Sequence, residues 1–453
     1  MITDKEKELA RFCISYAVSH GADAARASLS KSILDGCTLL NGELDKVTHS
    51  ADRSIYIYLF ADGKYGTFST NRLEKAELED FISKAITMVR MLGEDRCRSL
   101  PEKERTATDA VSGRELDLYD DGYGSSDSSA RIAKAQRLSI FKKVDNNGYR
   151  LISEECEYSE SMEDNFLVDS QGFEGRHTET AFSCFIEMTV EAQDGNRYSG
   201  FRWDATQKEA DLDIEECARK ALEKAIMQIG PKKRRSGRYR MVVDASVASK
   251  LVAPLLAALN ASSIQQKMSF LEGTVGKKVF SEGFTMMDLP RTKGRNGSRL
   301  FDTEGVSTKE APIIEGGIVR QYFVNTYMSR KMGMAPTVED VSRPCVMPYM
   351  KSKDLSSGEK DVSLEDILRY CSNGILVTGF NGGNCNPVTG DFSFGIEGFA
   401  FSKGKRIHPV KEMLITGNMT ELWNNFIAAG SDARTSARWQ IPSIAFDDVS
   451  FSA

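Results

Sequence analysis

The spacing of apolar positions predicts a helix, then strands, then a second helix at the start of the chain. Thr3 and Glu6 have the spacing of a capping box, and the apolar residues after them recur at helical intervals. Segments of alternating polarity predict strands at residues 25–34, 38–44 and 53–61. An Asp62-Gly63 hairpin turn follows, and an amphipathic stripe predicts a helix over 75–91. This order favours an α+β fold.

A similar order of elements returns after a polar stretch. Residues 100–129 are rich in Asp, Ser and Gly and predict a surface loop. Beyond it the pattern predicts a helix, strands and an amphipathic helix, at residues 129–145, then 151–158, 165–170 and 180–193, then 213–229. Residues 57–89 and 185–227 share a rhythm of strands, an Asp-Gly turn, a polar patch and an amphipathic helix. An internal duplication of this unit is therefore a hypothesis, which the sequence supports weakly because no residue identity accompanies the rhythm.

The character of the chain changes near residue 237. A buried-type strand at 239–243 leads to a helix that Asp244 can cap, and after about residue 260 glycine and β-branched residues dominate. We therefore predict two domains, an N-terminal α+β domain of residues 1–236 and a mostly β domain of residues 237–453. In the first, antiparallel sheets carry packed helices, so the predicted fold class is α+β.

Composition narrows the class of partner and compartment. The net charge of −6 argues against a general nucleic-acid surface, which needs a concentrated basic face. The N-terminus is charged where a signal peptide would be apolar, and no segment approaches the roughly 20 apolar residues of a membrane span. The nine cysteines are scattered without a C-x-x-C pair, which fits reduced thiols. We therefore expect a cytoplasmic protein with no nucleic-acid or membrane partner.

Short motifs follow one another in the second half of the chain. The clearest are residues 301–306 (FDTEGV), 389–395 (TGDFSFG) and 415–419 (ITGNM), with 269–272 (SFLE), 288–290 (DLP) and 315–319 (EGGIV) among them. Each motif is weak alone, but their collinear order resembles the TldD/PmbA family. That family was once described as modulators of DNA gyrase and is better understood as peptide-cleaving metalloproteins. The resemblance covers nearly all of the chain after residue 237.

The ligands that this resemblance would supply are missing. One branch of the family carries a His-Glu-x-x-x-His zinc helix, and the resemblance places Ala253, Pro254 and Ala258 at those positions. Alanine cannot coordinate a metal. The histidines of the chain are His20, His49, His177 and His408, and no cysteine follows Cys385, although the zinc branch uses a cysteine near its C-terminus. The chain therefore resembles the PmbA branch, also called TldE, with no metal ligand and no catalytic residue of its own.

The resemblance implies a metal-free subunit of a two-chain metallopeptidase. A TldD-like partner would hold the zinc, and the assembly would process or degrade unfolded or leader peptides that enter as extended strands. The alternative is a homodimeric peptide- or protein-binding regulatory protein, including a modulator of DNA gyrase, with no proteolytic role. A neighbouring gene that encodes the zinc helix would favour the subunit.

Contacts to substrate or partner are expected in two loop regions of the C-terminal domain. They are Gly382, Gly383, Gly390, Asp391, Ser393, Gly417, Asn418 and Asp432. A serine or cysteine hydrolase would need Ser393 or Cys385 beside His408, the only histidine near them in sequence. Asp302 and Glu304 could hold a cation, although a turn-stabilising role for Asp302 is favoured.

Overall fold

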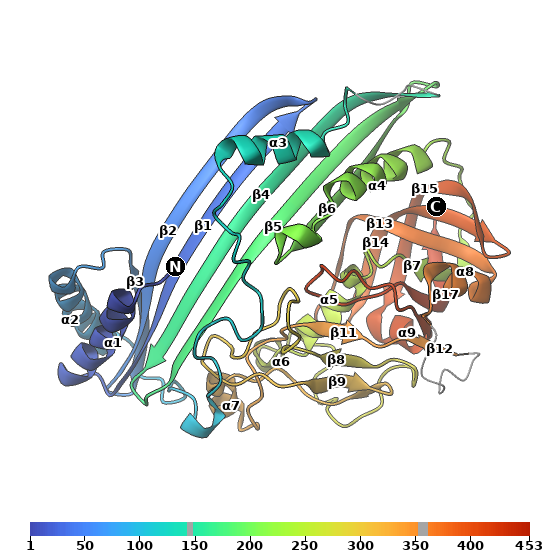
Figure 1. Cartoon of the computed structure of the whole chain (residues 1–453). Helices are drawn as coiled ribbons and strands as arrows, with labels where there is room; N and C mark the ends of the chain where they lie inside the picture. Colours follow the sequence, from blue (N-terminus) through green and yellow to red (C-terminus); the bar gives the residue numbers. More distant parts are fainter. Residues whose placement is uncertain (143–147, 352–360) are drawn as a thin grey trace. The chain divides into compact units, whose positions relative to one another are not determined.

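The computed structural model describes residues 1–142, 148–351 and 361–453. The fold is α+β, with helices and extensive sheets (Figure 1). The chain forms two compact units. The first unit comprises Met1–Glu223, Pro290–Lys309 and Val324–Glu339, and the second comprises Lys224–Leu289, Glu310–Phe323 and Asp340–Ala453. Both units are discontinuous in sequence, and the domain boundary at Ser236-Gly237 stays a prediction.

The first unit is built on one antiparallel sheet of long, curved strands in the order β3-β2-β1-β4-β5-β6 (Figure 1). The strands are β1 (Ala24–Leu40), β2 (Glu43–Ala61), β3 (Lys64–Thr70), β4 (Tyr149–Asp169), β5 (Glu174–Ala192) and β6 (Arg197–Thr206). The helices are α1 (Asp4–Ser19), α2 (Lys75–Met91), α3 (Ser128–Leu138), α7 (Thr326–Met332) and α4 (Ile214–Met227), whose last turn belongs to the second unit.

The order of one helix, three strands and another helix occurs twice in the described part of the chain. The first set is α1, β1 to β3 and α2, and the second set is α3, β4 to β6 and α4. The two sets of strands meet where β1 and β4 pair antiparallel in the middle of the sheet. Helices α1 and α2 pack on the odd-numbered side chains of β1 and β2, such as Leu29 and Ile57, in one apolar core. The apolar stripes of both helices are therefore confirmed.

The strands are longer than the polarity pattern predicts, and the separate strand over residues 38–44 is wrong. Strand β1 continues to Leu40, and the chain reverses at Asn41-Gly42 into β2. Both turn residues have positive φ, 51° and 77°, as the tightest hairpin turns require. The predicted Asp62-Gly63 turn is confirmed between β2 and β3, with φ of 54° and 70°.

Strand β4 likewise joins two predicted strands into one, because its polar middle is buried with charged partners. The Glu160 side chain is 1% exposed and accepts from Arg131 Nε and Lys134 Nζ, each at 3.0 Å. A buried carboxylate without a cation would be costly, whereas a paired one can continue a strand. Alternating polarity therefore ended the strand too early.

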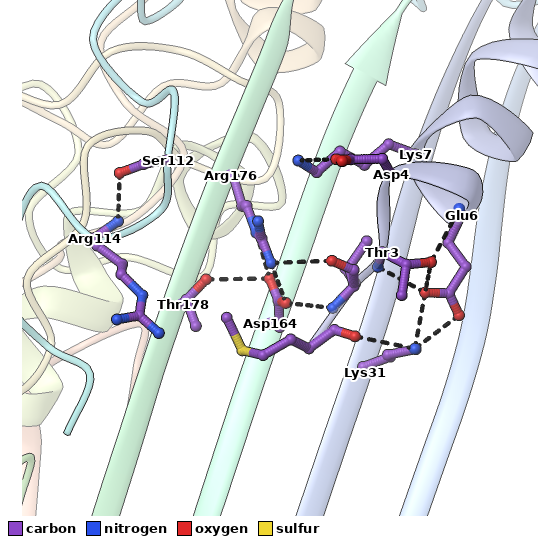
Figure 2. Close-up of polar contacts among 12 residues, drawn as sticks. Thr3, Asp4, Glu6, Lys7, Lys31, Ser112, Arg114, Asp164, Arg176 and Thr178 are labelled. Atoms are coloured by element: carbon purple, nitrogen blue, oxygen red, sulfur yellow. Dashed lines mark hydrogen bonds and ion pairs between the residues drawn. The ribbon is translucent and has the colours of Figure 1, made fainter. Parts of the chain in front are cut away.

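A second buried carboxylate of β4 anchors the N-terminus (Figure 2). Asp164 is fully buried and accepts from the backbone N–H of Ile2 at 2.6 Å, from Thr178 Oγ1 at 3.1 Å, and from Arg176 Nη2 at 2.6 Å. The same guanidinium donates to the carbonyl of Ile2 at 3.2 Å. Just beyond, the predicted capping box of Thr3 and Glu6 is confirmed at the start of α1.

The second unit contains a closed ring of five strands. Strands β7, β13, β14, β15 and β17 pair in that order, and β17 pairs again with β7. Their bounds are β7 (Gly237–Val243), β13 (Asn373–Cys385), β14 (Asp391–Ser402), β15 (Lys405–Asn418) and β17 (Ile444–Ser452), with β16 (Phe426–Ala429) and β12 (Tyr349–Met350) added beyond β17. A separate small sheet has the order β10-β9-β8-β11, formed by Ile318–Val319, Ala311–Glu315, Met286–Asp288 and Pro344–Val346.

Short helices complete the second unit. They are α5 (Ser249–Ala258), α6 (Ala261–Gln265), α8 (Leu364–Cys371) and α9 (Met419–Asn424). Helix α8 packs its apolar face on side chains of the ring, including Leu376 and Phe401. Within the residues described, every helix is too short or too polar to cross a membrane.

Candidate functional site

Most of the loop residues predicted as contacts gather where β13, β14 and β15 lie side by side. Asp391 at the start of β14 lies opposite Asn418 at the end of β15. The Asn418 amide donates to Asp391 Oδ1 at 3.0 Å and to the carbonyl of Thr389 at 2.8 Å. Hydrogen bonds from Asn418 and from Thr389 lower the pKa of Asp391. The segment around Asp391 and the end of β15 at Asn418 are therefore held together by hydrogen bonds at this end of the sheet.

The glycines of this region allow close backbone contacts. Gly383 has φ of 84°, and a Cβ there would lie 2.0 Å from the carbonyl oxygen of Ser393. Gly390 has φ of 80° and faces the ring of Phe270. Gly382 lies in β13, next to Gly383, and Gly417 lies in β15. Glycine is required at Gly383 because both its conformation and its contact exclude a side chain.

Asp432 has a different place and role. Its two carboxylate oxygens accept from the backbone N–H of Ser443 at 2.8 Å and from Ser443 Oγ at 2.6 Å. These bonds hold the segment between β16 and β17. Asp432 thus belongs to the loop 430–443, and the hydrogen bonds of the Asp391 and Asn418 loops do not include it.

A groove of about 420 Å³ borders this end of β13 and runs along α5. One face of α5 supplies Lys250, Ala253, Pro254, Ala257 and Ala258, at the spacing of a single helical stripe. The other walls come from Ser263, Met268 and Phe270 after α5, from Gly383, Asn384 and Cys385 of β13, from Pro387 in the following turn, and from Phe394 of β14. The opposite face of α5, with Leu251 and Leu255, is buried in the core. After Lys250, helix α5 is therefore apolar on both faces.

The groove coincides with the positions at which the family resemblance places a zinc helix. Ala253, Pro254 and Ala258 all line it, and none can bind a metal. The one thiol of the lining is Cys385, whose pKa is raised by burial and by the nearby Asp391 carboxylate, so the metal-binding thiolate is disfavoured. Among the described residues no three His, Cys, Asp or Glu side chains are grouped to hold a metal ion. The residues of this groove do not fit a zinc ion.

The structure also places the alternative catalytic residues. Cys385 and Ser393 lie near the start of β14, since Cys385 pairs with Phe392. His408 pairs with Ala400, eight residues farther along the same strand. At ~3.4 Å per residue the two ends are roughly 25 Å apart. His408 therefore cannot act as base for either nucleophile within this chain.

Asp302 and Glu304 belong to a structural turn of the first unit. Asp302 Oδ1 accepts from the backbone N–H groups of Glu304 and Val306, at 2.9 and 3.0 Å. Glu304 Oε2 accepts from the backbone and the hydroxyl of Thr326, at 2.9 and 2.8 Å. The favoured turn-stabilising interpretation of Asp302 is confirmed.

From the sequence, Ala253, Pro254 and Ala258 indicated only that ligands are missing, and the groove that they line was not predicted. One signal was present, because residues 251–258 are all apolar, which is typical of a buried or ligand-facing helix. The walls opposite α5 lie far away in sequence, so the spacing of residues within α5 could not reveal them.

Comparison with known proteins agrees with the resemblance. The domain patterns of the PmbA/TldA metallopeptidases match residues 27–89 (domain 1), 122–229 (central domain) and 236–453 (C-terminal domain). The metalloprotease PmbA of Escherichia coli O157:H7 is 24% identical over 436 residues, which cover 94% of this chain and 92% of that protein.

Solved structures share the whole fold. A protein of Bacteroides thetaiotaomicron, named as a proposed modulator of DNA gyrase, is 35% identical with a TM-score of 0.93, and the match covers 100% of both chains. TldE of Thermococcus kodakarensis has a TM-score of 0.79 at 18% identity, covers 99% of both chains and thus shows the fold alone. The chain belongs to the PmbA/TldA metallopeptidase family.

Proposed function

We propose that this chain is the metal-free subunit of a peptidase assembly of the TldD/PmbA type. A TldD-like second chain supplies the zinc, and the assembly processes or degrades unfolded or leader peptides in the cytoplasm. The observation that carries the proposal is the groove along α5, where Ala253, Pro254 and Ala258 stand at the positions of the zinc motif. None of these three side chains can bind a metal, which supports a zinc ion held by a second chain.

The edge of β13 supports a role in holding extended peptides. Strand β13 pairs with β7 through residues 375–377 and continues to Cys385, and its residues 383–385 line the groove. A strand edge can accept an extended peptide through backbone hydrogen bonds, whatever the side chains of the peptide. This chain would therefore help to position substrate, and the loops around Gly382, Asp391 and Asn418 would contact substrate or the partner chain.

Purified chains test the proposal. The chain alone should contain no stoichiometric zinc by mass spectrometry of metals and should cleave no unfolded peptide. The second chain should be recovered with it in a native pull-down from its own cells, and the pair should cleave unfolded peptides in a chelator-sensitive reaction. A glutamate-to-glutamine change in the zinc motif of the second chain is the matched control and should abolish cleavage. Chelator-sensitive cleavage by the pure chain alone would contradict the proposal.

The same pull-down distinguishes the peptidase subunit from the alternative function, a regulator with no proteolytic role. Recovery of this chain only with itself would favour a homodimeric peptide- or protein-binding regulator. The similar Bacteroides protein is named for a proposed role with DNA gyrase. Tight binding of this chain to purified gyrase, without any peptidase partner, would support that role.

A further inference from the structure

The groove along α5 has an unusual combination of lining groups. Its helical face offers Ala253, Pro254 and Ala257 in place of the polar residues that normally face solvent, and Ala257 is exposed. Met268, across the groove, is a large apolar side chain with 42% exposure. The volume of about 420 Å³ lies in the range of roughly 300–1,000 Å³ that is typical of small-ligand sites. These features are typical of a surface that an apolar ligand covers.

Among the described residues that line the groove, Lys250 is the single charged side chain. Its ammonium lies 5.2 Å from the centre of the Phe394 ring, a buried side chain in the groove wall. In the part of the chain that the structure describes, no carboxylate lies within ion-pair distance of Lys250. A lysine beside an apolar surface, without an acidic partner, is complementary to an anionic group attached to an apolar ligand.

We propose that this groove binds the C-terminal end of an apolar peptide, with the terminal carboxylate at Lys250 and the apolar side chains against α5 and Met268. The end of β13, beyond its pairing with β7, and the Asn384 side chain can form hydrogen bonds with the amide groups of a peptide. A fatty acid has no amide groups, so these polar groups favour a peptide as the ligand. The inference goes beyond the proposed function, because the binding is by this chain alone and requires no zinc subunit.

The first test measures binding of short fluorescein-labelled peptides to the full-length chain by fluorescence anisotropy. One peptide ends in apolar residues with a free carboxylate, and the other has the same sequence with a C-terminal amide. The carboxylate should bind about three- to tenfold more tightly, the range of a partly exposed charge-assisted hydrogen bond. Lys250→Gln should remove this preference, whereas Lys250→Arg should keep it. Lys277→Gln, an exposed lysine outside the lining, is the matched control and should change nothing.

A second variant tests the apolar wall independently of Lys250. Ala257→Glu places a charge on an exposed position of α5 and should weaken both peptides at least about tenfold, because the apolar contacts would bury a carboxylate. Ala76→Glu, on the exposed face of α2, should leave both affinities unchanged. Circular dichroism confirms that each variant is folded.

Several outcomes would overturn the inference. They are no saturable binding of either peptide, equal affinity for carboxylate and amide in the unchanged chain, or a preference that persists in Lys250→Gln. Displacement of the peptide by decanoate at equal concentration would instead assign the site to apolar anions in general. If the pure chain binds the peptide but no zinc partner exists, the inference stands and the proposed function fails.

Discussion

At the scale of single residues, Asp164 is the clearest source of stability in the first unit. Burial raises the pKa of Asp164, but hydrogen bonds from Arg176, Ile2 and Thr178 outweigh burial and hold it below its usual value. The carboxylate is therefore charged in the folded protein and supports both the sheet and the N-terminal segment.

Replacing this carboxylate should be severe. Asp164→Asn leaves the Arg176 guanidinium, with a side chain only 13% exposed, without its counter-charge. We expect the free energy of unfolding to fall by about 3 kcal/mol, as for other broken buried ion pairs. Asp80→Asn, which removes the exposed pair with Lys84, is the control and should cost less than about 0.5 kcal/mol. Denaturant unfolding gives both values, and equal losses would show that burial of the pair does not matter.

Glu6 gives a pH-dependent prediction at the same scale. Burial raises the pKa of Glu6, but contacts with Lys31 and Thr3 outweigh this effect. Together they lower the pKa from 4.5 to about 2. Because the folded pKa is depressed, the stabilisation is complete above 4.5 and is lost as the pH falls towards 2. Glu6→Gln should therefore destabilise the chain by about 1–2 kcal/mol at pH 6 and by less at pH 3. A difference that grows on acidification would contradict the assignment.

At the scale of elements, the sequence predicted the features that depend on residues close together in the chain, such as a helix cap and a hairpin turn. The capping box of Thr3 and Glu6 and the Asp62-Gly63 turn involve adjacent residues, and both are present. The length of β4 depends on Arg131 and Arg176, which reach its buried carboxylates from other elements. Polarity alone cannot distinguish such carboxylates from solvent-facing ones, so the pattern divided one strand into two.

The hairpin of β13 and β14 offers a prediction with its own control. Gly383→Ala must accommodate both positive φ and a Cβ 2.0 Å from the Ser393 oxygen, so we expect a loss of at least about 3 kcal/mol. Gly382→Ala also has positive φ, 69°, but no atom within 4 Å, and should lose only about 1 kcal/mol. Urea unfolding of the two variants measures the difference. Similar losses would show that the close approach at Gly383 relaxes at low cost.

At the scale of the whole molecule, the collinear motifs identified the family, but the groove required the fold. The motif order is a property of the sequence and led to the family, whereas the polarity pattern predicted the α+β class. The groove unites α5, the segment around Met268 and the end of β13, which are more than one hundred residues apart at their extremes. The pairing of β13 with β7 and with β14 brings these parts together, and no local pattern encodes that arrangement.

The discontinuous units lead to a final prediction about folding. Residues 290–309 and 324–339 belong to the first unit, although they follow the predicted boundary at residue 236. Within that unit Phe301 packs on Phe173 with ring centres 5.6 Å apart, and Gly305 accepts from the backbone of Ala107 at 3.0 Å. A fragment of residues 1–236 would lose these contacts and uncover an apolar cluster that includes Leu118.

We therefore expect the fragment 1–236 to unfold at a lower urea concentration than the first unit of the intact chain, and to bind a dye specific for apolar surface. The intact chain with Phe301→Ala should fall between the two, because it loses one contact of the cluster and keeps the backbone bonds. Unfolding followed by circular dichroism, with dye fluorescence, distinguishes the outcomes. A fragment as stable as the intact unit and free of dye would show that the later segments add little, and that residue 236 ends an independently folding domain. Since the chain passes repeatedly between the two units, we expect instead that both depend on synthesis of the C-terminal half before they reach full stability.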